Sequence, residues 1–485
     1  MSARNHSVIY DVLYGFIPIT SWEEEILSAP AFQRLRWIKQ LGFSNYIFPG
    51  AEHNRFAHVI GVMHSMHQML RALRIDVSDK ELFDRKSRSE AAILHKSLRI
   101  AALLHDLGTF PFSHAIENAY ILHGNKTRPT RKTSKGLLKN QKDLINNHEH
   151  LGAFIIKNTR YKGGITQILE DAGLDPQMIS LIIKGISPYS IANQLMHSDL
   201  DADRMDYLLR DAHYTGLKYG QFDREYLISN LETFKLPTGG LGFGVKESAQ
   251  HTVEDFLIAR FSWYSQVIRN PASAKFDILS TYVTKALLDS DHLHQFSDVL
   301  SMVETRDERF FWWNDMYFMT KLQEVRYKKS IKDPVTWEMI QMLLYREPPK
   351  TIRHAAFEHR IIPEGPTERN KHSKTALNKF NEMEAVIRKY GTGREWLLLD
   401  MPDRDVAFTK GNLSLKAKLA STPLKDHTHA AVESVKIVDR NNKPHLLARR
   451  ENSLMKHLAN VVNFVPNAYA NRAAYELLKK RKLVE

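Results

Sequence analysis

The chain contains the apolar run Leu98-Arg-Ile-Ala-Ala-Leu-Leu-His-Asp-Leu-Gly108, in which a histidine and an aspartate stand side by side near the end. Leu94 and Ala101 lie on a stripe at helical spacing whose next position is 105, where a core side chain is expected. Burying the imidazole of His105 and the carboxylate of Asp106 costs free energy unless both groups find partners. Because a bound divalent cation would satisfy both groups, the stretch predicts a metal site inside a helical core.

Helical periodicity continues through most of the first three hundred residues. Val59, Met63 and Met66 form one apolar stripe, which places Arg55 and His58 on a neighbouring face of the same helix. The pattern predicts further helices at residues 91–107, 148–156, 191–210 and 253–269. We therefore expect a mainly α fold.

The character of the chain changes beyond about residue 300. Residues 364–376 are polar and linker-like, strand patterns follow at 396–399 and 435–437, and a helix is expected to end at 479–482. Earlier, the glycine-rich residues 238–246 indicate a hairpin, since a phosphate-binding glycine loop would need a strand before it and a helix after it. The sequence predicts a helical domain over 1–300 and a smaller α+β lobe over 301–485.

Composition narrows the class of protein. The 485 residues are 43% hydrophobic and 25% charged, which is typical of a globular chain. No run of eighteen apolar residues and no apolar leader is present, so we expect a cytoplasmic protein without a membrane segment. Cysteine is absent, which excludes disulfides, thiolate metal ligands and a cysteine nucleophile.

The charge balance favours polyanionic partners. Lys and Arg number 68 against 55 Asp and Glu, a net charge of +13. Residues 123–147 are strongly basic and have hardly any acidic residues. This segment is either a solvated loop or a basic lid that contacts single-stranded nucleic acid near the site.

Four residues from distant stretches offer metal ligands: His58, His105, Asp106 and Asp203. Two imidazoles and two carboxylates suit an octahedral Mn, Fe, Mg or Zn ion with two open positions. Those positions could take a phosphate oxygen of a substrate and a water. Any one of these residues alone is more often a satisfied core histidine or a surface aspartate, so their surroundings decide.

Those surroundings carry a resemblance to a known family. Four motifs occur in order: His53-Asn-Arg-Phe-Ala-His58, His105-Asp-Leu-Gly-Thr-Phe-Pro-Phe-Ser-His114, His148-Glu149, and Asp201-Ala-Asp-Arg-Met-Asp-Tyr-Leu-Leu-Arg-Asp211. With them the chain resembles the HD-domain phosphohydrolases, and within these the deoxynucleoside triphosphate triphosphohydrolases. The resemblance is clear from Val8 to Asp277 and fainter beyond.

The resemblance implies cleavage between the 5′ oxygen and the α-phosphorus of a deoxynucleotide, which releases deoxynucleoside and inorganic triphosphate. It makes His114 the catalytic histidine, with Glu117 three residues on to orient it. His148 and Arg55 would hold phosphate oxygens. The remaining substrate contacts that it implies are Gln40 and Leu41 at the deoxyribose, Tyr207 and Asp211 at the sugar, and Arg204 and Arg260 at the outer phosphates. Four of the supporting residues also have a structural alternative: Tyr207 as a core residue, Arg260 as a surface arginine, Arg55 as a salt-bridge partner and Glu117 as support for a helix turn.

Several departures from the family pattern leave the substrate open. Thr109 stands where a histidine is usual, and Ile268 and Asn270 replace tyrosine and histidine near the nucleotide. The alternatives are an HD phosphohydrolase that acts on another nucleotide or phosphoester, and a non-catalytic scaffold that binds nucleotide or nucleic acid. Intact metal ligands together with His114 argue against the scaffold.

Regulation and assembly are also expectations from the resemblance. Ser7 and Ser28 occupy the positions where one branch of the family carries a lysine and an aspartate that hold a guanine nucleotide. We therefore expect no strict requirement for GTP. Relatives assemble into dimers and tetramers, so a homo-oligomer is expected.

Overall fold

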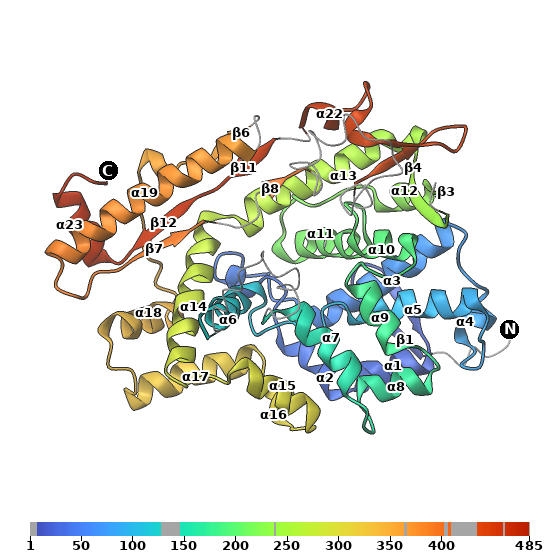
Figure 1. Ribbon diagram of the computed structural model, residues 1–485, viewed down its shortest axis with the longest axis horizontal. Coiled ribbons are helices and arrows are strands. Elements are labelled where there is room, and N and C mark those ends of the chain that lie inside the picture. The colour runs from blue at the N-terminus through green and yellow to red at the C-terminus, as the bar shows by residue number, and fades with distance from the viewer. Residues whose placement is uncertain are drawn as a thin grey trace, which may run out of the picture.

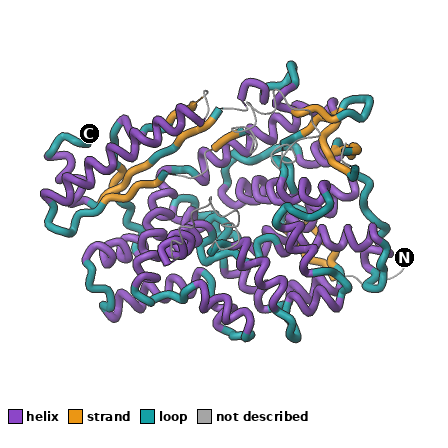
Figure 2. Tube along the Cα trace, viewed as in Figure 1, coloured by secondary structure: helices purple, strands orange, loops and turns teal. Residues whose placement is uncertain are grey.

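The computed structural model describes residues 7–127, 146–236, 239–362, 366–401, 406–408, 434–458 and 461–484. Helices dominate this part of the chain, which confirms the predicted mainly α class (Figures 1 and 2). Among the helices of these residues, none combines the length and apolar character needed to cross a membrane.

Helices of the first three hundred residues form the body of the molecule. In chain order they are α1 Ser21–Ser28, α2 Pro30–Gln33, α3 Arg55–Ala72, α4 Asp79–Phe83, α5 Glu90–Leu104, α6 His114–Thr127, α7 His148–Asn158, α8 Ile165–Asp171, α9 Pro176–Ile183, α10 Ser190–His197, α11 Ala202–Thr215, α12 Arg224–Ser229, α13 Gln250–Trp263 and α14 Pro271–Asp289. Helix α3 packs between α5 and α11, and α6 packs along α14 (Figure 1).

The helices that carry the site begin at defined caps. Asn54 caps α3, Ser89 caps α5, Asn147 caps α7 and Asp201 caps α11, and each side chain accepts a backbone N–H in the first turn. These caps fix where each helix starts, and therefore which residues face the interior.

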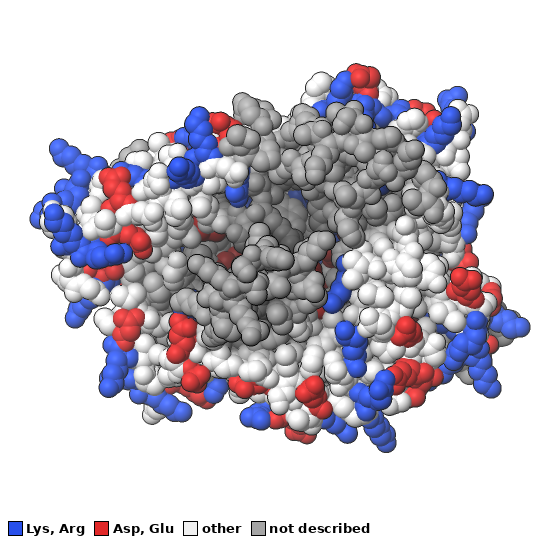
Figure 3. Space-filling model, viewed as in Figure 1, with Lys and Arg blue, Asp and Glu red and all other residues white. Residues whose placement is uncertain are grey.

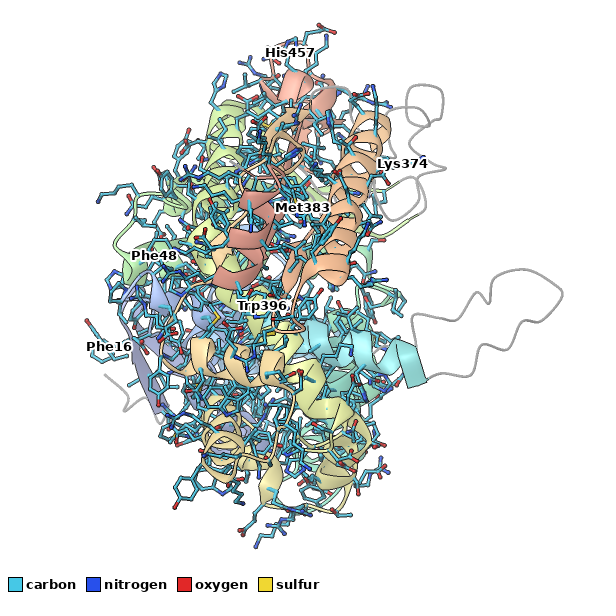
Figure 4. The ribbon with its side chains drawn as sticks, turned by 90° about the vertical axis from the view of Figure 1, so that its left-hand side faces the viewer. Phe16, Phe48, Lys374, Met383, Trp396 and His457 are labelled. Atoms are coloured by element: carbon cyan, nitrogen blue, oxygen red, sulfur yellow. The ribbon has the colours of Figure 1, made fainter. Side chains whose placement is uncertain are left out.

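Two hairpins lie within the helical body. Strands β1 Ser7–Asp11 and β2 Gly15–Ile19 pair in antiparallel fashion, and Phe16 projects outward from them (Figure 4). Strands β3 Leu231–Lys235 and β4 Leu241–Lys246 form the hairpin predicted from the glycine-rich segment. Strand β4 also pairs in parallel with β9 Lys436–Val438, which extends the sheet to the order β10-β9-β4-β3 with β10 Pro444–Leu446.

The last third of the described chain adds helices and short strands. Its helices are α15 Phe296–Glu304, α16 Arg309–Trp312, α17 Asp315–Lys328, α18 Pro334–Leu344, α19 Pro366–Tyr390, α22 Met455–Leu458 and α23 Arg472–Lys480. Its other strands are β5 Lys350–Thr351, β6 Arg360–Ile362, β7 Leu397–Asp400, β8 Val406–Ala407, β11 Val462–Phe464 and β12 Asn467–Ala470, in the orders β6-β11-β8 and β5-β12-β7. A lobe boundary at residue 300 stays a prediction.

Three of the expected segments differ in the structure. The predicted linker over 364–376 falls largely within α19, because Ala376, Phe380 and Met383 recur at helical spacing and are buried despite the polar composition. Met383 lies against α23, where Leu478 belongs to the same apolar cluster (Figure 4).

The single helix expected over 191–210 is two helices, because Asp201 adopts an extended backbone and caps α11. The helix expected over 253–269 ends at Trp263, and a π-helical turn follows over Tyr264–Ile268.

One pair of half-buried acids lies where α14 meets β7. Burial, together with the neighbouring carboxylate of Asp400, raises the pKa of Asp277 to about 7. Burial also raises the pKa of Asp400. Since the folded protein favours the protonated form of Asp277, its contribution to stability is fully present below about pH 4, its ordinary range, and is lost as the pH rises through 7.

We therefore expect Asp277→Asn to be more stable than the parent at pH 8, by about 1–2 kcal/mol after solvent screening is allowed for. The difference should shrink as the pH is lowered toward 4. Urea unfolding at pH 4.5, 6 and 8 measures it. A variant that is equally or less stable at pH 8 would contradict the repulsion between the two acids.

Candidate metal centre and catalytic site

Three predicted ligands converge where α3, the end of α5 and α11 meet. The ligand atoms of His58, His105 and Asp203 all lie within 4.8 Å of one another. The Oδ1 atom of Asp203 is 3.1 Å from Nε2 of His58 and 3.7 Å from Nε2 of His105. This spacing suits a single cation between them.

Asp106 lies at the edge of this group. Its Oδ2 atom is 3.8 Å from Nε2 of His58 and 3.6 Å from Nε2 of His105. The same oxygen accepts a hydrogen bond of 2.5 Å from Nη1 of Arg55. Although burial opposes ionisation, the Arg55 guanidinium holds the pKa of Asp106 well below its usual range, so this carboxylate is charged.

Hydrogen bonds on the far side of each imidazole orient the rings. Nδ1 of His58 lies 2.8 Å from Oδ2 of Asp206, and Nδ1 of His105 lies 2.8 Å from the carbonyl oxygen of Ala102. Both acceptors require the proton on Nδ1, which leaves the lone pair on Nε2. Within the described residues both Nε2 atoms are buried and have no hydrogen-bond partner. The residues therefore fit a divalent cation.

Asp206, which the sequence reasoning missed, belongs to a buried charge network behind His58. It pairs with Arg210 on the next turn of α11, and Arg210 also pairs with Asp11 at 2.9 Å. Its position in the sequence could have indicated this role, because Asp206 lies three residues after Asp203, close to the same face of the helix.

A glycine on α3 makes this network possible. A Cβ added at Gly61 would lie 1.9 Å from Oδ1 of Asp206 and 2.4 Å from Nη2 of Arg210. Any side chain here would push α11 away from α3 and move Asp206 off His58.

We expect Gly61→Ala to lower the melting temperature and to weaken metal binding by about 10–100-fold, the usual cost of losing a residue that orients a ligand. Gly152→Ala is a suitable control, because a Cβ there would meet its nearest neighbour at 3.4 Å. Calorimetric titration with Mn²⁺ makes the comparison. Unchanged affinity in Gly61→Ala would show that Asp206 does not orient His58.

The predicted catalytic residues form a second group. Oε2 of Glu117 lies 2.8 Å from Nδ1 of His114, and Oε1 lies 2.6 Å from Nδ1 of His148. Burial opposes both charges, but the mutual attraction holds the pKa of Glu117 well below its usual range and raises that of His148 to about 9. The ring of His114 is 66% exposed, so a substrate can reach it.

Arg55 connects the two groups. Besides Asp106, it donates from Nε to Oγ of Ser113 at 3.2 Å and from Nη2 to the carbonyl oxygen of Gln40 at 3.3 Å. Ser113 directly precedes His114, so one guanidinium contacts both a predicted metal ligand and the turn that presents the predicted catalytic histidine.

The residues expected at the sugar and phosphates lie in the surrounding wall. Tyr207 is buried, and within the described residues its hydroxyl has no hydrogen-bond partner. Asp211 lies 2.7 Å from Nε2 of His53, a partner the sequence reasoning missed. The two arginines already face acids: Arg204 pairs with Asp201, and Arg260 pairs with Asp199.

The pair expected at the deoxyribose and two of the departures from the family pattern can be located in the structure. Gln40 and Leu41 are both buried beside the turn that Arg55 holds, and Oε1 of Gln40 has no hydrogen-bond partner within the described chain. Thr109 donates from Oγ1 to the carbonyl oxygen of Asp106 at 2.7 Å, so it closes the turn that follows the predicted ligands His105 and Asp106. Asn270 caps α14 through a 2.9 Å bond from Ala272.

The two positions expected at a regulatory site, Ser7 and Ser28, lie outside the groups of predicted metal ligands and catalytic residues. Ser7 donates to Glu24 at 2.8 Å, and Ser28 lines a surface pocket together with Lys162 and Asp171. The absence of a GTP requirement stays a prediction.

The core of the basic segment predicted over 123–147 lies outside the described residues. On the face shown in Figure 3, Lys and Arg of the described chain are interspersed with Asp and Glu.

The chain is similar in sequence to a known domain family and to several known proteins. Residues 55–211 match the HD domain family, so the chain contains an HD domain. An uncharacterized protein of Mycoplasma genitalium is 30% identical over 59% of this chain and 62% of its own length, and one of Bacillus subtilis is 33% identical over 56% and 52%. The human deoxynucleoside triphosphate triphosphohydrolase SAMHD1 is 27% identical over 59% and 44%. The matches thus cover between 44% and 62% of the length of these curated relatives.

Solved structures share the fold. A hypothetical protein from Aquifex aeolicus superimposes with a TM-score of 0.65 at 22% identity, covering 99% of both chains. A phosphohydrolase from Bacteroides thetaiotaomicron gives 0.62 at 20% identity, covering 96% of this chain and 99% of its own. At this identity the likeness establishes the fold alone.

Proposed function

We propose that this protein is a metal-dependent phosphohydrolase that converts deoxynucleoside triphosphates to deoxynucleoside and inorganic triphosphate. The observation that carries the proposal is the contact of Arg55 with both Asp106 and Ser113. It joins a ligand set with two open imidazole nitrogens to a His114–Glu117 pair that is accessible to substrate.

His58, His105, Asp106 and Asp203 would hold the divalent ion, with Mn, Mg, Fe and Zn as candidates. When bound, the ion would polarise a substrate phosphoryl group and lower the pKa of a water. Asp206 fixes His58 in the binding tautomer, and the Ala102 carbonyl does the same for His105.

His114 would act as the acid of the reaction. Glu117 holds Nδ1, which leaves Nε2 to give a proton to the departing 5′ oxygen. His148 shares the same carboxylate, and its raised pKa keeps a positive charge near the phosphates at neutral pH.

The proposed class of substrate, a deoxynucleotide, rests on the relatives and on the side chains expected around it. Tyr207 offers a buried hydroxyl and Gln40 a buried amide oxygen that have no hydrogen-bond partner in the described part of the chain, and both are suited to hydrogen bonding with a sugar. Leu41 beside Gln40 would leave a ribose 2′-hydroxyl without a partner, which favours deoxyribose. Asp211 would contact the sugar edge, and Arg204 and Arg260 the outer phosphates.

A second candidate is an HD phosphohydrolase for another nucleotide or phosphoester. The side chains of Thr109 and Asn270 are used in local turns, so they do not replace the histidines expected at the nucleotide. Fewer nucleotide contacts would favour a different or smaller substrate.

Chromatography separates the two candidates. We expect purified protein with Mn²⁺ to release deoxynucleoside and intact triphosphate from at least one of the four dNTPs, without added GTP. Stepwise release of single phosphates, or turnover of other phosphoesters alone, would overturn the dNTP assignment. Light scattering of the same sample tests the expected dimer or tetramer.

A further inference from the structure

The turn that presents His114 has an unfavourable backbone. Phe112 and Ser113 adopt φ angles of +49° and +57°, in the left-handed region that non-glycine residues rarely occupy. Each such residue costs about 1–2 kcal/mol, so surrounding contacts must hold the turn. His114 is the first residue of α6, and its direction depends on these two residues.

The carboxylate of Asp315, which is distant in sequence, stabilises this turn. Oδ1 of Asp315 accepts the backbone N–H of Phe112 at 2.6 Å, and Oδ2 accepts the backbone N–H of Lys39 at 2.9 Å. Ser113 closes the ring by donating from Oγ to the carbonyl oxygen of Lys39 at 2.8 Å. Asp315 is buried and fastens the catalytic turn to the segment that leads into Gln40.

The segment that carries Asp315 is linked through Arg34 to the turn that follows His105 and Asp106. Arg34 is fully buried and donates from Nη1 to the carbonyl oxygen of Trp313 and from Nη2 to that of Leu107, both at 3.0 Å. Leu107 directly follows the His105–Asp106 pair. A shift of residues 313–315 would therefore be felt by both the metal ligands and His114.

We infer that Asp315, more than one hundred residues beyond the end of the HD-domain match, is a positioning residue of the active site that sets the direction of His114. The inference rests on the proposed function for its kinetic readout but not for its structural one. The segment 313–315 at the start of α17 is in this sense part of the catalytic apparatus.

The test is Asp315→Asn. The asparagine amide has the size of the carboxylate and keeps one acceptor oxygen. Its N–H₂ group, however, faces one of the two backbone N–H donors and cannot accept from it. We expect kcat to fall about 10–100-fold because a displacement of about 1 Å has effects of that order, while the KM for substrate and the metal content stay within about twofold. If this variant does not accumulate as folded protein, Asp315→Ser, which retains an oxygen acceptor, carries the same expectation.

Asp333→Asn is the matched control. Asp333 also lies at a helix N-terminus, where it caps α18 by accepting Thr336 N–H at 2.9 Å, and Asn caps equally well. It should leave kcat unchanged. A kcat in Asp315→Asn that is within twofold of the parent, or a loss of bound metal that accounts for the lost activity, would overturn the inference.

A second readout needs no substrate. In protein labelled with ¹³C at histidine Cε1, Asp315→Asn should shift the His114 resonance, assigned by its absence in His114→Gln, and leave that of exposed His251 in place. An unmoved His114 signal would overturn the positioning role even if no dNTP is hydrolysed. A shifted signal in a protein inactive on dNTPs would leave that role standing while the proposed substrate fails.

Discussion

Asp106→Ala is expected to abolish both turnover and stoichiometric metal binding. Its carboxylate lies 3.6 and 3.8 Å from the two open imidazole nitrogens and is kept ionised by Arg55. Loss of one of four ligands removes an anion and a coordination position together, so turnover should fall by at least about 10³-fold. Metal content after dialysis, measured by plasma emission, and dNTP hydrolysis are the two readouts.

The substitution also leaves Arg55 buried without its partner, which can cost about 3–5 kcal/mol of stability. Asp199→Ala is the matched control, because it leaves Arg260 in the same condition and removes no predicted ligand. The control should retain the metal. If Asp106→Ala retains it as well, Asp106 is not a ligand. If both variants lose it together, the loss follows from the unpaired buried arginine and gives no support to Asp106 as a ligand.

His114→Gln should lower kcat by about 10²–10⁴-fold without changing metal content, since a general acid contributes in that range. Glu117→Gln should have a similar effect, because it removes the charge that orients His114 and His148. Steady-state kinetics with Mn²⁺ and a dNTP, together with metal analysis, measure both variants.

The chain offers a close control for this pair. His251 and Glu254 have the same spacing, the same exposed imidazole and buried carboxylate, and a contact of 2.9 Å, but they lie on α13 away from the metal ligands. His251→Gln should leave kcat unchanged. A His114→Gln enzyme that matches it in activity would remove His114 from the mechanism.

Much of the candidate metal centre could be predicted from the sequence because its predicted ligands interrupt strong local patterns. His105 and Asp106 stand at the end of an apolar helix, and Asp203 follows a capping aspartate at the start of another. Helical spacing then fixes the direction of each side chain before the tertiary structure is known.

The supporting residues could not be predicted in this way. Asp206, His53 and Asp315 act through partners 148, 158 and 203 or more positions away, and no local pattern encodes such contacts. The polar helix α19 and the break before α11 were missed for a related reason. Burial of one apolar face, and a single capping aspartate, outweighed the average composition of those segments.

An anomalous difference map from crystals grown with Mn²⁺ would locate the bound ion. We expect one strong peak between His58, His105, Asp106 and Asp203, with both histidines bound through Nε2. A map without a peak at this position, or a peak bound through Nδ1 with Asp206 displaced, would contradict it.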